Sequence, residues 1–244
     1  PYLNARIAEA MVWGYQGRPG HRFEKEEQIM ACVKHFALYG AAEAGRDYNT
    51  VDMSRQKMFN EYMVGYKAAA DAGAGSFMTS FNVVDDVPAS VNRWLMTDVL
   101  RKQWGWNGFV VTDYISINEC VDHGVGNYHE VAVKALKAGV DMDMVGETFF
   151  TQAKSAVEAG ELKMEDVDRA CRRVLEAKYR LGLFRDLGDA SAVWRMKKLR
   201  LSAELRNLFN KKSYIETIYS GISTLTDSYY LRPRELMISA QYSF

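Results

Sequence analysis

The chain has 244 residues, of which 48% are hydrophobic and 25% are charged, and its formal net charge is +0. This composition is ordinary for a globular protein and excludes wholesale disorder. The balanced charge gives no electrostatic reason to expect a nucleic acid or an anionic membrane as partner. Three widely spaced cysteines, Cys32, Cys120 and Cys171, predict neither a disulfide framework nor a metal site, and we expect Cys32 and Cys171 to be buried.

No apolar run approaches the roughly 20 residues of a membrane-spanning helix. The chain begins at Pro1 without a Met or an export signal, so we expect it to be a piece of a longer protein.

Strand-like and helix-like segments alternate along the first three quarters of the chain. Short apolar runs predict strands at residues 29–38, 76–81, 108–114 and 139–144. Three- and four-residue periodicity predicts helices at residues 2–17, 54–72, 91–104, 115–122, 129–138, 148–159 and 164–181. In the last helix the pattern predicts an inward face made of Val167, Ala170, Val174, Leu175 and Tyr179. Alternation of this kind predicts a parallel sheet with right-handed crossovers.

The predicted fold class is therefore α/β. A complete (β/α)8 barrel of the TIM type needs eight strands and roughly 250 residues. Because about four parallel strands are present here, we predict a partial, half barrel over residues 1–186, with both sheet edges open to pairing.

The pattern changes after residue 187. Apolar and polar residues alternate with period two in residues 199–206 and again in residues 234–244. This alternation predicts antiparallel β structure, so residues 187–244 are interpreted as a linker and a hairpin-like β-rich tail.

The strand at residues 108–114 ends in Asp113. Side chains at the carboxyl ends of parallel strands face the ligand, so Asp113 is a candidate working carboxylate. The alternative is that Asp113 only caps the following helix. Lys34 and His35 interrupt the first strand near its carboxyl end. From the residues alone, a surface lysine and a hydrogen-bonded core histidine are the favoured interpretation.

Seven segments, taken in their order and spacing, resemble glycoside hydrolase family 3, the β-glucosidase-like enzymes. They are residues 34–36, 45–49, 78–82 with Pro88, 100–101, 108–113, 139–142 and 181–184. The resemblance implies a retaining hydrolase of β-glucosidase or β-xylosidase type. Such an enzyme removes terminal β-linked sugars through a glycosyl-enzyme intermediate, here on Asp113. It also implies a glycoside or oligosaccharide as partner and a bacterial periplasmic or secreted location. No metal or cofactor is expected, because the carboxylates show no clustering of metal ligands.

The resemblance implies a set of substrate-binding residues besides Asp113. They are Lys34, His35, Met78, Phe81, Tyr114, Arg46 and Tyr48. Lys34 and His35 match a pair that hydrogen-bonds sugar hydroxyls, and Phe81 stands where the family commonly has Tyr. For Arg46 and Tyr48, ordinary loop roles are equally open.

The family's acid/base glutamate comes from a domain after the barrel, and the sequence assigns no second carboxyl group here. Glu119, His123, Asp143 and Glu147 follow Asp113 without a geometric reason to choose among them. The alternative function is a barrel remnant that binds sugar without cleaving it. We expect an active form to be a homodimer that completes the barrel through its open sheet edges.

Residues 198–244 resemble the C-terminal end of a TonB-dependent outer-membrane receptor. The carriers are residues 205–210, residues 230–235 and a period-two strand ending in Phe244. This resemblance implies a chimera with its junction in residues 187–197; the alternative is an ordinary appended β-hairpin. Two or three strands cannot close in a membrane, so no membrane partner is expected.

Overall fold

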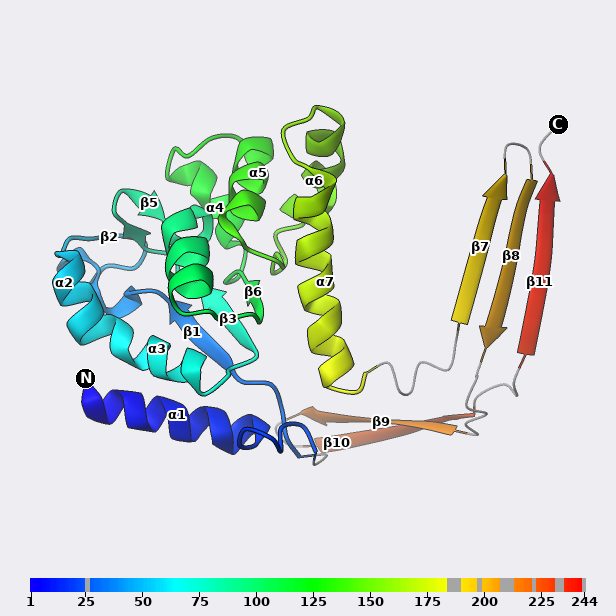
Figure 1. Cartoon of the computed structure of the whole chain (residues 1–244), viewed down its shortest axis with the longest axis horizontal. Helices are drawn as coiled ribbons and strands as arrows, with labels where there is room; N and C mark the ends of the chain where they lie inside the picture. Colours follow the sequence, from blue (N-terminus) through cyan, green and yellow to red (C-terminus); the bar gives the residue numbers. More distant parts are fainter. Residues whose placement is uncertain are drawn as a thin grey trace. The chain divides into compact units, whose positions relative to one another are not determined.

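The computed structural model describes residues 1–24 and 27–183, together with the backbone of five later strands. The chain divides into two compact units, Pro1–Leu181 and Gly182–Phe244 (Figure 1). Each unit is described by itself.

The first unit is built on a parallel sheet with the strand order β1-β3-β6. Its strands are β1 (Cys32–Phe36), β3 (Ser76–Thr79) and β6 (Phe109–Val111). Phe36, Phe77 and Val110 are fully buried, as expected for strands covered by helices on their faces. A small second sheet has the order β2-β4-β5 and lies in the connecting loops. Its strands are β2 (Thr50–Val51), β4 (Val83–Val84) and β5 (Val87–Pro88).

The predicted strand at residues 139–144 is only an isolated parallel bridge, Val111 to Met142. Backbone hydrogen bonds do join this segment to the edge of β6: the N–H groups of Asp141 and Met142 donate to the Val110 carbonyl. Beyond residue 142 the segment does not continue as a strand: the Met144 N–H donates to Thr112 Oγ1, and the Asp143 carboxylate accepts from the N–H of Thr148 at the start of the next helix. The predicted fold class, a partial barrel with parallel strands, is nevertheless correct.

Helices connect the strands and cover the sheet (Figure 1). They are α1 (Tyr2–Gln16), α2 (Arg55–Lys57), the π-helical turn η3 (Met58–Tyr62), α3 (Met63–Asp71), the π-helical segment η5 (Trp94–Gln103), α4 (Ser116–Asp122), α5 (Tyr128–Ala138), α6 (Thr148–Glu158) and α7 (Met164–Arg180). Single turns η1 (Tyr39–Ala41), η2 (Glu43–Gly45) and η4 (Ala89–Val91) lie in the loops. Ser54 caps α2 through its side chain, and Asn127 with Glu130 forms a capping box on α5.

The core is centred on the Phe36 ring. It makes edge-to-face contacts with Tyr66 and Phe77 at 5.3 Å and with Trp104 at 5.8 Å between ring centroids. These rings come from β1, α3, β3 and the end of η5, so one aromatic cluster joins two strands of the sheet to two helical segments.

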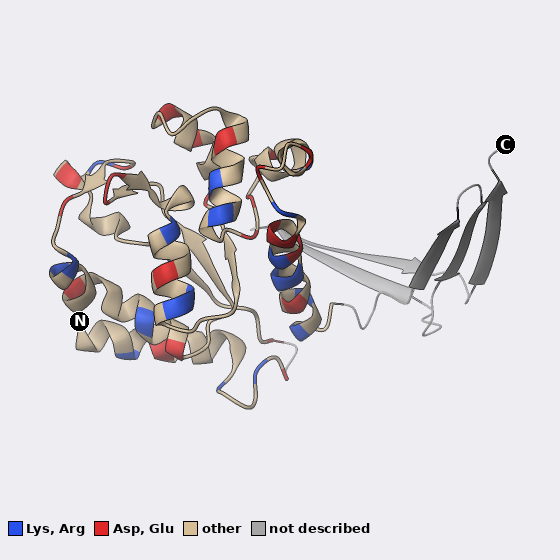
Figure 2. Ribbon diagram, turned by 45° about the horizontal axis from the view of Figure 1, so that its top comes forward, with Lys and Arg blue, Asp and Glu red and all other residues tan. Residues whose placement is uncertain are grey.

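The predicted inward face of α7 is wrong in part. Ala170 is buried, but Leu175 is 45% exposed and Tyr179 is 74% exposed. The helix carries Lys, Arg, Asp and Glu along most of its length (Figure 2). It packs through small residues, Ala170 and Ala177, whose short side chains allow close approach.

The cysteine expectation is wrong as well. Cys32 and Cys171 are exposed, whereas Cys120 is buried and donates from Sγ to the Ser116 carbonyl at 3.3 Å. In the described residues β1 pairs with β3 alone, so one side of Cys32 is not covered by a neighbouring strand.

The second unit contains two antiparallel sheets. One has the order β7-β8-β11 and the other pairs β9 with β10. Its strands are β7 (Ala190–Met196), β8 (Leu199–Arg206), β9 (Ser213–Ser220), β10 (Ser223–Tyr230) and β11 (Glu235–Tyr242). The two segments with period-two alternation pair with each other, Leu199 opposite Tyr242, which confirms the predicted β-rich character of the tail.

In the part of the chain that the structure describes, no helix is both long enough and apolar enough to cross a membrane.

Candidate active site

Asp113 lies just past the carboxyl end of β6, with its side chain 16% exposed. Its Oδ1 accepts a hydrogen bond from the Tyr114 N–H at 2.7 Å. The N-cap of α4 is Ile115, which has a left-handed backbone, and no side chain caps the helix. Asp113 is therefore not the helix cap, and its second oxygen is directed elsewhere.

A chain of buried hydroxyl groups holds the start of α4 behind Asp113. Thr79 at the end of β3, Ser90 and Ser116 are linked by hydrogen bonds of 2.7 Å between Thr79 and Ser90 and 2.7 Å between Ser90 and Ser116. Because each hydroxyl can donate one bond and accept another, this chain satisfies itself without water. It fixes the turn from β6 into α4 against the neighbouring strand.

His35 meets Asp113 across the middle strand. Its Nε2 lies 3.3 Å from Asp113 Oδ2, although β1 and β6 are separated by β3 in the sheet. The His35 backbone carbonyl accepts from the Tyr66 hydroxyl at 2.6 Å, which anchors this end of β1. Partial burial lowers the pKa of His35, the Asp113 carboxylate raises it, and the Lys34 ammonium lowers it again. The lowered pKa favours a neutral imidazole at neutral pH.

Aromatic rings extend from His35 along one side of this pair. The His35 and Tyr39 ring centroids are 5.1 Å apart, Tyr39 and Phe81 are 6.1 Å apart, and Phe81 and Tyr48 are 4.8 Å apart. Two of the predicted residues, Phe81 and Tyr48, thus lie in one ring cluster with His35. Aromatic faces of this kind suit the apolar C–H faces of a sugar ring.

The sequence reasoning missed Tyr39 and Asp47. Burial raises the pKa of the Tyr39 hydroxyl to about 12, and the charge and hydrogen bond of Asp47 act in the same direction. Burial also raises the pKa of Tyr48, with contributions from Glu119, Asp47 and Asp113. Their positions in the sequence could have indicated both residues. Tyr39 comes directly after the first predicted strand, and Asp47 stands within the motif of residues 45–49.

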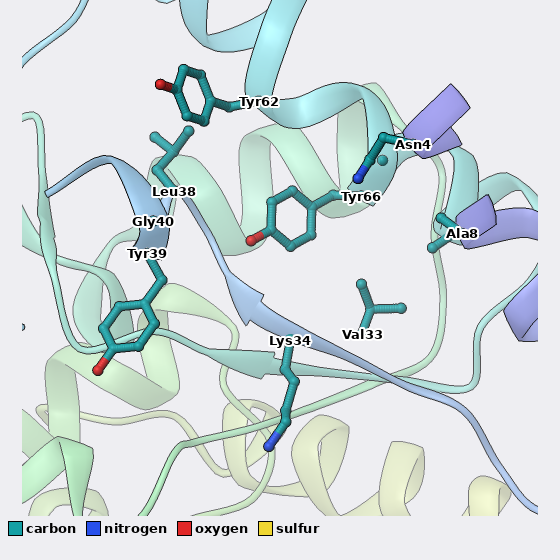
Figure 3. Close-up of a pocket in the computed structure, with 11 residues that line it drawn as sticks. Asn4, Ala8, Val33, Lys34, Leu38, Tyr39, Gly40, Tyr62 and Tyr66 are labelled. Carbon is teal, nitrogen blue, oxygen red and sulfur yellow. The ribbon is translucent and has the colours of Figure 1, made fainter. Parts of the chain in front are cut away.

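Lys34 is exposed and acts on His35 through its charge. It also borders a cavity of about 290 Å³ between α1, β1 and α3, which Tyr62 and Tyr66 help to line. In Figure 3 the ammonium end of Lys34 points away from Val33 and Tyr66. Neither Asp113 nor His35 lines that cavity, so it is distinct from the place where these two side chains meet.

Three other predicted residues lie more loosely around the cluster. Met78 is half-buried on β3 and pairs in register with Val111 on β6. Tyr114 is 56% exposed, and Arg46 is exposed in the loop between β1 and β2. Their substrate-binding roles stay predictions.

Among the acidic and imidazole groups near Asp113 in sequence, Glu119 is one whose pKa the Asp113 charge affects. Burial raises the pKa of Glu119, and the charges of Asp122 and Asp113 add to that rise. Its Oε2 is buried without a hydrogen-bond partner in the described residues. Glu119 also lines a hollow of about 420 Å³ with Tyr48, Asp122 and His123.

Two of the other candidates, Asp143 and Glu147, have structural roles at the start of α6. Asp143 accepts from the Thr148 and Phe149 N–H groups, and Glu147 occupies the N-cap position of α6. In the described ranges, no group of three or more His, Cys, Asp and Glu side chains is arranged to hold a metal ion.

Comparison with known proteins places this site in a family context. Residues 1–177 match the model of the glycosyl hydrolase family 3 N terminal domain. The periplasmic beta-glucosidase of Salmonella typhimurium is 45% identical over 187 residues, which are 76% of this chain and 24% of that protein. A beta-xylosidase of Formosa agariphila is 36% identical over 194 residues, which are 75% of this chain and 27% of that protein.

Among solved structures, the beta-glucosidase from Listeria innocua matches with a TM-score of 0.74 and 44% identity. The match covers 76% of this chain and 26% of that one. The Listeria enzyme has also been solved with glucose and with isofagomine. The present chain spans about a quarter of the length of these relatives. Since the family model covers well over half of it, the chain belongs to glycosyl hydrolase family 3 through the N-terminal domain of that family.

Proposed function

We propose that this domain carries the nucleophile half of a retaining β-glucosidase or β-xylosidase site, with Asp113 as the attacking group. The observation that carries the proposal is the pair at the carboxyl edge of the sheet. Asp113 Oδ2 lies 3.3 Å from His35 Nε2, next to a cluster of aromatic rings. The names of the relatives, beta-glucosidase and beta-xylosidase, support the same substrate class.

The way the Asp113 side chain is held supports its proposed role as nucleophile. One oxygen is held by the Tyr114 N–H and the other faces His35, so the carboxylate has a fixed orientation. In the first step an Asp113 oxygen bonds to the anomeric carbon while the bond from that carbon to the leaving oxygen breaks. In the second step water displaces the carboxylate and restores it.

Substrate binding follows from the groups around the pair. We propose that Lys34 and His35 donate to sugar hydroxyls and that Phe81, Tyr48 and Tyr114 pack against the ring. A cation beside an imidazole offers donors to neighbouring hydroxyl groups, and carbohydrate C–H faces pack on aromatic rings.

The test is hydrolysis of a nitrophenyl β-glucoside and a nitrophenyl β-xyloside by the purified chain. A nitrophenolate leaves without needing a proton, so this substrate separates the attack by Asp113 from acid catalysis. Asp113→Ala is expected to abolish turnover. The matched control is Asp71→Asn, which removes an exposed carboxylate paired with Lys67 far from the sheet's carboxyl edge and is expected to leave turnover unchanged. Unchanged turnover in Asp113→Ala would rule out the proposed nucleophile.

One observation favours a second candidate, a domain that holds sugar without cleaving it. Retaining hydrolysis needs two carboxyl groups about 5 Å apart. Asp141 is engaged in ion pairs with Arg101 and Arg173, and Asp143 accepts a hydrogen bond at the start of α6. Neither of these two carboxylates is therefore free to act as the second group. Glucose binding in a calorimeter, combined with no turnover of either aryl glycoside, would favour this candidate over the hydrolase.

We also propose that two copies pair through the open sheet edges to complete a barrel. In the described residues β1 pairs with β3 alone, which leaves its outer edge free for another strand. Size-exclusion chromatography with light scattering tests this, and a fully active monomer would contradict it.

We propose the periplasm as the location, which is supported by the names of the relatives from Salmonella typhimurium and Dickeya chrysanthemi. Fractionation of bacterial cells that express the parent gene tests that.

For the tail, we propose that residues 187–244 are a segment distinct from the family domain of residues 1–186. The family match, which ends at residue 177, supports this division. We further propose that residues 198–244 derive from a TonB-dependent receptor terminus, an origin consistent with the antiparallel pairing of β8 and β11. Failure of the purified tail to partition into detergent micelles would rule out an outer-membrane role for these strands.

A further inference from the structure

A cationic cavity of about 600 Å³ lies between η5, the end of α5 and the start of α7, away from the carboxyl edge of the sheet. Six of the described residues that line the cavity are basic, and Asp166 is the only acidic residue that lines it. The six are Arg93, Arg101, Lys137, Lys163, Arg169 and Arg173. Such a concentration is notable because the whole chain has a formal net charge of +0.

Carboxylates neutralise only part of this charge. Asp141 is buried behind the cavity and pairs with Arg101 at 2.6 Å and with Arg173 at 2.8 Å. Arg169 pairs with Asp166 at 2.7 Å. Arg93 lies 3.4 Å from Asp98, which already binds Lys102 at 2.8 Å. Counting all three carboxylates still leaves three of the six positive charges in excess.

Arg101 is the most buried of these basic side chains. Its side chain is 9% exposed, and its guanidinium is held by the carbonyls of Gly108 and Gly139 as well as by Asp141. Its Nε is buried without a hydrogen-bond partner in the described residues. Burial lowers the pKa of Arg101 to about 10; Asp141 opposes this change, and the charges of Arg173 and Arg169 add to it. Additional negative charge in the cavity would relieve this repulsion.

Gly139 lines the cavity and has a φ of +107°. A Cβ at this position would lie 2.9 Å from Thr97 Oγ1 and 3.5 Å from Arg101 Nε, so the glycine allows the backbone to lie close to both side chains. The exposed ammonium groups of Lys137 and Lys163 approach the cavity from α5 and from the start of α7. Mobile ammonium groups in front of fixed guanidinium groups suit an oxyanion with several acceptor atoms.

We propose that this cavity binds a phosphate group, with Lys137, Lys163 and Arg169 as its direct contacts and Arg101 and Arg173 as fixed charges behind them. Free inorganic phosphate and the phosphate of a sugar phosphate share this chemistry. None of the lining residues belongs to the Asp113 cluster, so the anion binds without competing for the sugar site.

The experiment titrates the full chain with inorganic phosphate and measures binding by calorimetry and by thermal unfolding. Sodium chloride keeps the ionic strength constant throughout. Binding to the folded state raises the unfolding midpoint, and the midpoint continues to rise as the phosphate concentration exceeds the dissociation constant. The double variant Lys137→Ala/Lys163→Ala removes two exposed cations and leaves the Asp141 pairs in place. It is expected to weaken phosphate binding at least about tenfold, since hydrogen bonds to charged groups are worth this much each.

The matched control is Lys57→Ala/Lys154→Ala, which removes two exposed lysines on α2 and α6 outside the cavity and is expected to bind phosphate as the unaltered chain does. A second arm replaces inorganic phosphate with a glucose phosphate. Equal binding of both identifies the phosphate group alone as the ligand, and binding of the glucose phosphate only identifies the sugar phosphate. The proposal is overturned if neither ligand stabilises the chain beyond the chloride control, or if both double variants bind equally well.

Discussion

Replacing Asp141 tests how the domain is held together behind the candidate site. The side chain is 1% exposed and forms three interactions: with Arg101 at 2.6 Å, with Arg173 at 2.8 Å, and with the Val110 N–H at 2.8 Å. Asp141→Asn preserves the shape and one acceptor for Val110 but removes the charge. Breaking a buried ion pair by removing one partner destabilises by about 3–5 kcal/mol, because it leaves a buried charge without compensation.

The magnitude follows from burial. Arg101 is almost fully buried, whereas Arg173 is 19% exposed and can turn partly toward water. We therefore expect Asp141→Asn to lower the free energy of unfolding by about 3 kcal/mol, near the lower end of that range. Asp141→Ala also leaves the Val110 N–H without an acceptor, which adds about 1 kcal/mol or more. Against the 5–15 kcal/mol that typically stabilises a domain, this loss is large.

The assay is urea unfolding followed by the helical circular dichroism signal, which reports the first unit because every described helix lies in it. Asp71→Asn is the control, since its pair with Lys67 is exposed and such pairs are worth at most about 1 kcal/mol. If Asp141→Asn destabilises no more than Asp71→Asn does, the ion-pair cluster is not what holds β6 against η5 and α7.

Three further predictions concern the site. Asp113→Asn removes the charge that raises the pKa of His35, so the imidazole pKa should fall further; an NMR titration in which it rises would contradict the assigned pairing. Glu119→Gln should stabilise the chain more at pH 7 than at pH 4. The raised pKa of Glu119 means that its protonated form is favoured by folding, and that contribution is present below the ordinary value of 4.5 and lost as pH rises through the folded value. Urea unfolding at both pH values measures this, and an effect of Glu119→Gln that does not change with pH would count against the burial of that carboxyl. Phe81→Tyr adds a hydroxyl next to Tyr39 and Tyr48 and should raise kcat/KM on an aryl glucoside by a factor that corresponds to about 1 kcal/mol; a fall would show that the ring cluster has no room for it.

Local patterns predicted the features that depend on local chemistry. Apolar runs located the centres of β1, β3 and β6, and the acidic residue at the end of one run proved to be a partly buried carboxylate facing His35. The period of the helices predicted most of their bounds to within a few residues.

Features that depend on distant residues were not predictable in this way. Asp141 stands in a segment that reads as a strand, yet its partners Arg101 and Arg173 lie 40 and 32 residues away in sequence. No local pattern distinguishes such a buried ion-pair acceptor from a catalytic carboxylate. The exposure of Leu175 and Tyr179 on α7 has a similar cause, because this helix packs through Ala170 and Ala177 instead.

The measurement that tests the central claim most directly is mass spectrometry of the chain after reaction with a fluorinated aryl glucoside, whose glycosyl-enzyme intermediate hydrolyses slowly. The account predicts one sugar adduct per chain, located by peptide fragmentation on Asp113 and absent from Asp113→Ala. Turnover of the unmodified aryl glucoside with the adduct on another residue would contradict it.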